Sequence, residues 1–325
     1  MNGNGMEIEI GLSAVVVAVD HDTPLTLTSP PVPGGAEGGA LPFGRFDPIR
    51  HRTFEAGLRD WVEAQTALQL GYVEQLYTFG DRGRHAEAEA AGRVVSVGYL
   101  ALTRRDPEAE GSLGGIGARW RPWYDYFPWE DFREGPPELL TATILPALGR
   151  WAKAAPTAGP PARALGRLER FRLAFAEGGE GWDEERVLDR YELLYEAGLV
   201  AEAQRDGRVA PDVVLPALGL PMQHDHRRIL ATAISRLRSK LKYRPVIFEL
   251  MPPEFTLTDL QRTVEAVAGR HLHKQNFRRL VENAKLVEAT GGTDTRTGGR
   301  PAGLFRFRRE VLQERPGAGV RYGHR

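Results

Sequence analysis

Hydrogen-bond donors are concentrated in one stretch near the C-terminal end of the chain, HLHKQNFRRLVENAKL, where apolar residues recur at helical spacing. The donors in the first half of this predicted helix are His273, Lys274, Gln275, Asn276, Arg278 and Arg279. Phe277 lies among them and is expected to face inward, so that one face packs on protein while the other meets base edges and phosphates. Arg296 and Arg300, in the loop TDTRTGGRPA, could contact adjacent phosphates. The pattern predicts a recognition helix for double-stranded DNA.

The charges are unevenly distributed along the chain, although their sum is zero. Residues 236–325 contain 19 Lys and Arg against 9 Asp and Glu, whereas the rest contains 24 against 34. A locally positive surface attracts polyanions whatever the total charge. A nucleic-acid partner is therefore indicated for the C-terminal part, with a solvated basic tail or a winged helix that contacts only protein as the alternatives.

The elements around the predicted recognition helix follow the order of a winged helix. FTLTDLQRTVEAVAG has a helix cap at Thr256 or Thr258, a buried stripe of Leu260, Val264 and Val267, and a stop at Gly269. The recognition helix follows it, and LVEATGG and GLFRFRR then read as two strands. Helix, turn, helix and β-ribbon is the outline of this DNA-binding module.

The N-terminal third predicts a mixed sheet with one helix. EIEIGLSAVVVAVD (7–20) is typical of a buried central strand and leads into a Pro- and Gly-rich loop. HRTFEAGLRDWVEAQTAL (51–68) reads as an amphipathic helix whose core stripe is Phe54, Leu58, Trp61 and Leu68, interrupted by Gln65. YVEQLYTFGD and RVVSVGYLALTR follow as strands around a polar turn.

Residues 119–218 differ in character and predict a mostly helical insertion. The aromatic run from Trp120 to Trp129 is expected to form its core or a subunit contact. LLTATILPALGRWA and VLDRYELLYEAGLV read as helices. Beyond the insertion, residues 225–243 predict a helix with Asp225 as its N-cap and a stripe of Ile229, Leu230, Ala233, Leu237 and Leu241.

Several kinds of chemistry are disfavoured by the sequence. The chain has no cysteine, so disulfides, thiol redox chemistry and thiolate metal sites are excluded. His224 and His226 flank Asp225, but alternate residues at a helix start rarely face one site, so no metal site is expected. No leader pattern and no apolar run of membrane-spanning length occur, and we expect a cytoplasmic protein.

Helix 57–68 resembles the helix of the Nudix box, whose glutamates hold Mg²⁺ against a diphosphate. If Arg59 takes the place of the box arginine, Asp60 and Glu63 fall on carboxylate positions. However, Ala64 then replaces the second of the paired glutamates and His51 the upstream one. We therefore expect a helix that forms a wall of a binding pocket and takes no part in hydrolysis, with no catalytic residues.

The chain resembles the Nudix-related transcriptional regulators of NAD metabolism, of the NrtR type, and among them a longer, NadQ-like branch of NAD regulators. YVEQLYTFGDRGR and RVVSVGYLAL are similar to the stretch after the degenerate box, while RLRSKLKYRPVIFELMPPEFTLTDLQ, KQNFRRLV and TGGRPAGLFRF are similar to the linker and winged helix. The resemblance covers roughly residues 5–103 and 221–308. It implies a repressor of NAD biosynthesis or salvage genes that senses ADP-ribose or a related NAD metabolite.

A diphosphate effector of this kind needs cationic donors and an aromatic face for its base. The candidates that the resemblance suggests for this pocket are Glu74, Tyr77, Phe79, Asp81, Arg82, Arg84 and Arg93. The arginines would hold phosphates, the acids would orient a ribose, and Tyr77 or Phe79 would stack on the base. For each arginine, a solvated turn is the alternative.

Together these observations predict an α+β protein: a degenerate Nudix-like α/β/α sandwich over residues 5–243 with its insertion at about 119–218, a winged helix-turn-helix domain over 244–312, and a disordered tail over 313–325. We expect a homodimer that binds a double-stranded DNA operator and a nucleotide effector, and that requires no cofactor, metal or membrane. An active Nudix pyrophosphatase that cleaves ADP-ribose-like nucleoside diphosphates is the alternative.

Overall fold

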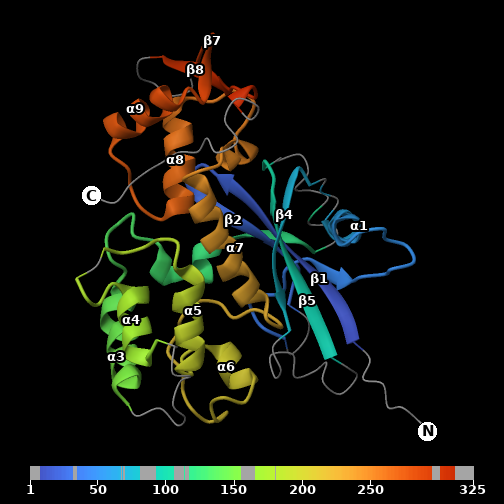
Figure 1. Ribbon diagram of the computed structural model, residues 1–325, viewed down its shortest axis with the longest axis vertical. Helices are drawn as coiled ribbons and strands as arrows, with labels where there is room; N and C mark the ends of the chain where they lie inside the picture. Colours follow the sequence, from blue (N-terminus) through green and yellow to red (C-terminus); the bar gives the residue numbers. More distant parts are fainter. Residues whose placement is uncertain are drawn as a thin grey trace.

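The computed structural model describes residues 8–31, 35–66, 68, 70–80, 93–105, 113, 117–154, 165–179, 181–294 and 301–311. A six-stranded mixed sheet occupies the N-terminal part (Figure 1). Its strands are β1 Ile8–Asp20, β2 Thr23–Thr28, β3 Phe43–Arg45, β4 Tyr72–Phe79, β5 Arg93–Leu102 and β6 Arg119–Pro122. The order is β4-β5-β1-β2-β6, with β3 pairing with β1, and β1 and β5 are parallel while the other pairs are antiparallel.

The central strand β1 is buried on both faces because helices cover both sides of the sheet. Leu12, Ala14 and Val16 belong to a hydrophobic cluster with helix α1, Phe54–Thr66. Val15 and Val17, on the other face, pack in a larger cluster with helix α7, His226–Leu241. Successive side chains of a strand point to opposite faces, so this one apolar run serves both layers.

A helical block, residues 123–218, lies beyond α7 on the second face (Figure 1). Its elements are η1 Trp123–Asp125, η2 Pro128–Glu130, the π-helix η3 Leu140–Ile144, α3 Leu145–Lys153, α4 Arg167–Phe175, α5 Val187–Glu196 and α6 Ala201–Arg205. Trp123, Tyr126, Phe127 and Trp129 are completely buried. The prediction that the aromatic run forms core of the block or a subunit contact is therefore confirmed as core for these four residues, while Trp120 lies on β6 and is partly buried against the cluster around α1.

The C-terminal elements form a helix-turn-helix followed by a β-ribbon, as predicted. After the short helix η4, Val246–Leu250, come α8 Leu257–Ala268, α9 Lys274–Ala284, β7 Val287–Asp294 and β8 Ala302–Phe307. The ribbon is joined to the domain by a bridge between Phe255 and Phe305 and by the stacked rings of Phe248 and Phe307, 4.2 Å apart.

Several details differ from the sequence predictions. β2 and β3 were not predicted, and residues 119–122, expected to open the insertion, form the edge strand β6. In α1 the buried stripe runs through Leu58 and Val62, whereas Trp61 and Gln65 hydrogen-bond to the backbone of β3. Asp225 occupies the N-cap position of α7, but its side chain makes no capping bond.

Candidate functional site

Helix α9 has well-defined ends, and its buried residues lie on one face. His273 is the N-cap, and Lys285 ends the helix in the left-handed conformation, with φ of 50°. Phe277 and Val281 are buried in the large hydrophobic cluster that also contains residues of α7 and α8, while Leu280 is half-buried. One turn of spacing between these apolar residues leaves the remaining faces to solvent.

The predicted recognition residues are all exposed on this helix or at its start. They are His273, Lys274, Gln275, Asn276, Arg278 and Arg279. Within the part of the chain that the structure describes, Lys274 and Arg278 form no ion pair, and Arg279 makes only a long bond of 3.4 Å to the Asn276 side chain. Their donors are therefore available to a ligand. The two wing arginines of the prediction, Arg296 and Arg300, lie outside the described residues.

The turn between α8 and α9 is held by one carboxylate that the sequence analysis did not single out. Glu265 accepts bonds from the backbone N–H of Leu272 at 2.8 Å and the Gln261 side chain at 2.7 Å, and its other oxygen lies 3.0 Å from His271 Nδ1. Burial alone would raise the pKa of Glu265, but these hydrogen bonds outweigh it and lower the pKa. The carboxylate is therefore charged at neutral pH, and its hydrogen bonds tie α8 to the turn at His271 and Leu272.

Helix α8 itself is capped at both ends as the sequence predicts. The Thr256 side chain accepts from the Asp259 N–H at 3.1 Å, and the Asp259 carboxylate accepts from the Thr256 N–H at 3.0 Å. This reciprocal pair is a capping box, and it selects Thr256 over Thr258. Gly269 ends the helix with φ of 72°.

The carboxylates of α1 do not gather into a metal site. Asp60 lies 3.3 Å from the ring of His51, the residue at the upstream glutamate position of the box, while Glu63 and Ala64 are exposed. Arg59 pairs with Glu55 at 2.9 Å and donates to the Leu70 carbonyl. No group of three or more His, Asp or Glu residues suited to a metal occurs in the described part of the chain. This donor set does not fit a Mg²⁺ ion that needs several carboxylate oxygens.

The effector candidates on β4 differ in what they offer a ligand. Tyr77 is 61% exposed, at a register shift between β4 and β5. Phe79 is 2% exposed, so its ring is occupied by core contacts and cannot stack on a base in this conformation. Asp81, Arg82 and Arg84 lie outside the described residues, as does the side chain of Arg93, which begins β5. The assignment of an effector pocket to these residues stays a prediction.

Two of these candidates instead tie β4 to α7. Glu74 forms an ion pair with Lys240 at 2.5 Å, and the hydroxyl of Tyr72 bonds to both, at 2.8 and 2.9 Å. Burial would lower the pKa of Lys240, but its bonds to Glu74 and Tyr72 raise it, so the cation stays paired. Near the start of α7, the Arg228 guanidinium lies 5.3 Å from the centre of the Phe79 ring. These contacts join the predicted effector strand to the helix that leads into the winged helix.

The histidines near the start of α7 have structural contacts. His226 Nδ1 accepts from the Leu41 N–H at 3.1 Å, so in the neutral ring Nε2 carries the proton and faces Ser13 Oγ at 3.5 Å. This tautomer cannot take a proton from Ser13. The ring of His224 packs against those of His226 and Phe43, at 5.3 and 5.4 Å between centroids.

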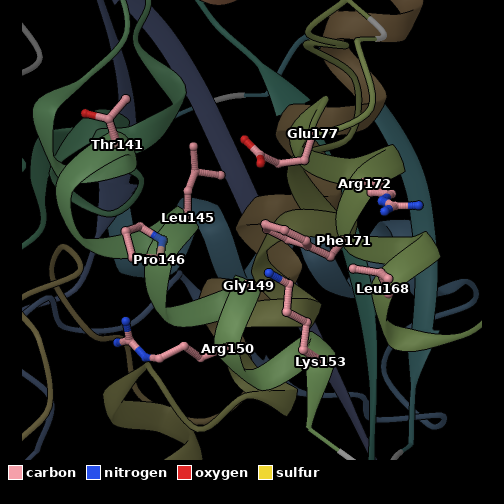
Figure 2. Close-up of a pocket in the computed structure, with 10 residues that line it drawn as sticks. All are labelled: Thr141, Leu145, Pro146, Gly149, Arg150, Lys153, Leu168, Phe171, Arg172 and Glu177. Atoms are coloured by element: carbon pink, nitrogen blue, oxygen red, sulfur yellow. The ribbon is translucent and has the colours of Figure 1, made fainter.

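Two hollows of ligand size lie elsewhere on the molecule. A groove of about 450 Å³ is lined by residues of α3 and α4. The ends of Lys153 and Glu177 point toward it, whereas Arg150 points away from Phe171 (Figure 2). A second, of about 550 Å³, lies between η4, β8 and Arg104 and carries both acidic and basic side chains. Neither is lined by Glu74, Tyr77 or Phe79.

Comparison with known proteins agrees with this architecture. Residues 247–307 match the model of the family described as the NrtR DNA-binding winged helix domain. The structure of Shewanella oneidensis NrtR complexed with a 27mer DNA aligns over 97% of this chain and 99% of that chain, with a TM-score of 0.58 and 20% identity. The chain has the fold of the NrtR-type regulators. The resemblance and the fold class predicted from the sequence are confirmed at this level.

Two further proteins match over different shares of the chain. The ADPR responsive transcriptional repressor NtrR of Acinetobacter baylyi is 42% identical over 91 residues, which are 28% of this chain and 36% of the relative. The matched segment thus spans about a third of the length of this curated relative. The relative is shorter than the chain described here. A MutT/nudix family protein from Enterococcus faecalis aligns over 95% of this chain and 89% of that chain, with a TM-score of 0.51 and 14% identity.

Proposed function

We propose that this NrtR-like chain is a DNA-binding transcriptional regulator, a repressor of NAD biosynthesis or salvage genes. In this proposal its Nudix-like part senses ADP-ribose or a related NAD metabolite without hydrolysing it. The observation that carries the proposal is the polar face of α9, whose cations are exposed and without ion-pair partners among the described residues. That helix lies in the segment matching the NrtR DNA-binding model.

The donor set of α1 supports a sensing role for the Nudix-like part. A helix with Ala64 exposed in place of a glutamate and with Asp60 beside a histidine offers too few oxygens to hold Mg²⁺ against a diphosphate. A ligand that is bound and not cleaved can act as a signal. The name of the Acinetobacter relative, an ADPR responsive repressor, makes ADP-ribose the first ligand to test.

We infer further that the chain acts as a homodimer, because operator half-sites are normally matched by a symmetric protein. Ligand in the sensor would shift α7 through its contacts with β4 at Glu74 and Phe79. Since α7 contacts α8, the shift would change the positions of the two recognition helices on the operator. The ligand can do this only in proportion to how much more tightly it binds the shifted conformation than the unshifted one.

Binding of duplex DNA at several salt concentrations tests the regulator function. With a duplex from the region upstream of the gene that encodes this chain, we expect specific binding whose affinity falls steeply as salt rises. Absence of salt-dependent binding would favour a winged helix that contacts protein.

The alternative function, an active Nudix pyrophosphatase, has Asp60 and Glu63 in its favour. It predicts release of AMP from ADP-ribose in the presence of Mg²⁺. Turnover that is lost in the Glu63→Gln variant would assign hydrolysis to α1 and contradict a purely sensory role.

A further inference from the structure

We propose that the helical block (residues 123–218) positions the winged helix, and that its buried carboxylate, Glu130, is the positioning residue. The inference builds on the proposed DNA-binding function, and it assigns a role to the part of the chain for which the sequence suggested none. In the region that the structure describes, the block holds the C-terminal end of α8, directly before the turn that leads into α9.

Glu130 joins two arginines in a site closed to solvent. Its Oε1 accepts from Arg190 Nε at 2.6 Å, and its Oε2 accepts from Arg190 Nη2 at 2.7 Å and from Arg238 Nη1 at 2.8 Å. All three side chains are 0 or 1% exposed. Glu130 belongs to η2, Arg190 to α5 and Arg238 to α7. One carboxylate therefore ties two elements of the block to α7.

Arg238 and two neighbouring residues of the block donate to the winged helix. Arg238 Nε donates to the Val267 carbonyl at 2.9 Å, and the Tyr124 hydroxyl donates to the Ala266 carbonyl at 2.8 Å. The N–H of Phe132 donates to the Gly269 carbonyl at 2.7 Å. The last carbonyls of a helix have no partner within the helix and attract cations. The block and α7 therefore supply the C-terminal cap of α8.

The block and the turn after α8 are in close backbone contact. A Cβ added at Gly269 would lie 2.4 Å from the Glu130 carbonyl oxygen, so the backbones of the block and the turn touch. A second buried acid of the block, Glu184, lies 3.3 Å from Lys242 after α7 and 3.5 Å from Arg270 in the turn. Buried charges tolerate little displacement because each must keep its partner.

This geometry makes the block, the end of α7 and α8 move as one body. In the proposed mechanism, the separation of the two recognition helices in a dimer is then set by the block and not by a flexible linker. Weakening the hydrogen bonds to the end of α8 should make the protein less selective for one spacing between half-sites, while each recognition helix still binds its half-site.

Two variants and a matched control test the proposal. Tyr124→Phe removes only the hydroxyl that bonds to Ala266, and Glu130→Gln removes the charge between the arginines. Glu196→Gln is the control, because it breaks an ion pair with Arg170, 2.7 Å, that lies within the block and away from α8. Hydrogen exchange of the full-length protein over residues 257–285 should be about fivefold faster in Tyr124→Phe, the effect of losing one ordinary hydrogen bond. The control should match the parent.

The second measurement is affinity for duplexes whose half-sites are moved apart base pair by base pair. The parent and Glu196→Gln should prefer one spacing, and this preference should flatten in Tyr124→Phe and Glu130→Gln. A lower melting temperature with an unchanged spacing profile and unchanged exchange in α8 and α9 would overturn the positioning role. If the parent bound no duplex, the DNA-binding function would fail, while hydrogen exchange would still decide whether the block caps α8.

Discussion

At the scale of single residues, some charged side chains of the molecule are paired in its interior and others are exposed. Glu130 forms ion pairs with both Arg190 and Arg238 inside the molecule, whereas Lys274 and Arg278 are exposed and form no ion pair in the described structure. The first group orders the fold. The second is free to meet phosphates, and its variants should alter DNA binding while leaving the fold intact.

Lys274→Ala and Arg279→Ala should each weaken duplex binding. Loss of one phosphate contact should lower the slope of log affinity against log salt by about one, and loss of a base contact should relax specificity at one position. Arg172→Ala, an exposed cation of α4, is the matched control because it makes the same charge change far along the chain from α9. Variants that bind the duplex as tightly as the parent would exclude α9 as the recognition helix.

Glu265→Gln should loosen the turn between α8 and α9 in a pH-dependent way. The pKa of Glu265 is lowered in the folded protein, so its charged form contributes stability above the ordinary carboxyl pKa near 4.5 and loses it as pH falls through the folded value. Melting curves should therefore separate parent and variant at neutral pH, with the difference shrinking below about pH 4.5. An equal difference at pH 7 and pH 3 would show that the charge contributes nothing.

At the scale of elements, the sequence predicts helices better than edge strands. Leu260, Val264 and Val267 repeat every three or four residues, and α8 forms where they predict it. β2 and β6 escaped prediction because each is short and lies beside a loop or an aromatic run, so that their pairing depends on partners distant in the chain. Periodicity reports which residues are buried, and it cannot report which backbone edges meet.

The contact between α1 and β3 shows the same limit and can be tested directly. Trp61 was assigned to the core stripe, but it packs on β3 and donates to the Arg45 carbonyl at 2.8 Å. A Cβ at Gly44 would lie 2.2 Å from the Trp61 ring. Gly44→Ala should therefore destabilise the protein by about 1–3 kcal/mol in denaturant unfolding.

The double variant gives the control for this contact. If the clash with the indole is the cause, Gly44→Ala should cost much less in a Trp61→Ala background, with a coupling energy of at least about 0.5 kcal/mol. Additive costs would place the strain elsewhere.

The exposed polar face of α9 could be predicted because it depends on the local spacing of apolar residues around Phe277. The effector site could not be resolved to the same degree. Glu74 and Phe79 were chosen for their types, but the structure places them against Lys240 and Arg228 of a helix more than a hundred residues away. Only Tyr77, 61% exposed, offers an open ring among the candidates whose side chains are described.

At the scale of the whole molecule, the sheet, the helical block and the winged helix meet at α7, and α8 also contacts β2 of the sheet. The sheet contacts α7 through β4 and β5, α7 contacts the helical block, and both hold α8 (Figure 1). Within the described residues, no helix has the length and apolar character needed to cross a membrane. The arrangement connects the Nudix-like sheet with the exposed basic helix α9, as the proposed ligand control of DNA binding requires.

The affinity of the full-length protein for its operator duplex, measured by equilibrium titration with and without saturating ADP-ribose, tests this connection most directly. We predict that ADP-ribose changes the dissociation constant at least about fivefold, the lower end of typical coupling between two sites. An identical affinity in both titrations, with ADP-ribose shown by calorimetry to be bound, would contradict control of the DNA reader by the Nudix-like part.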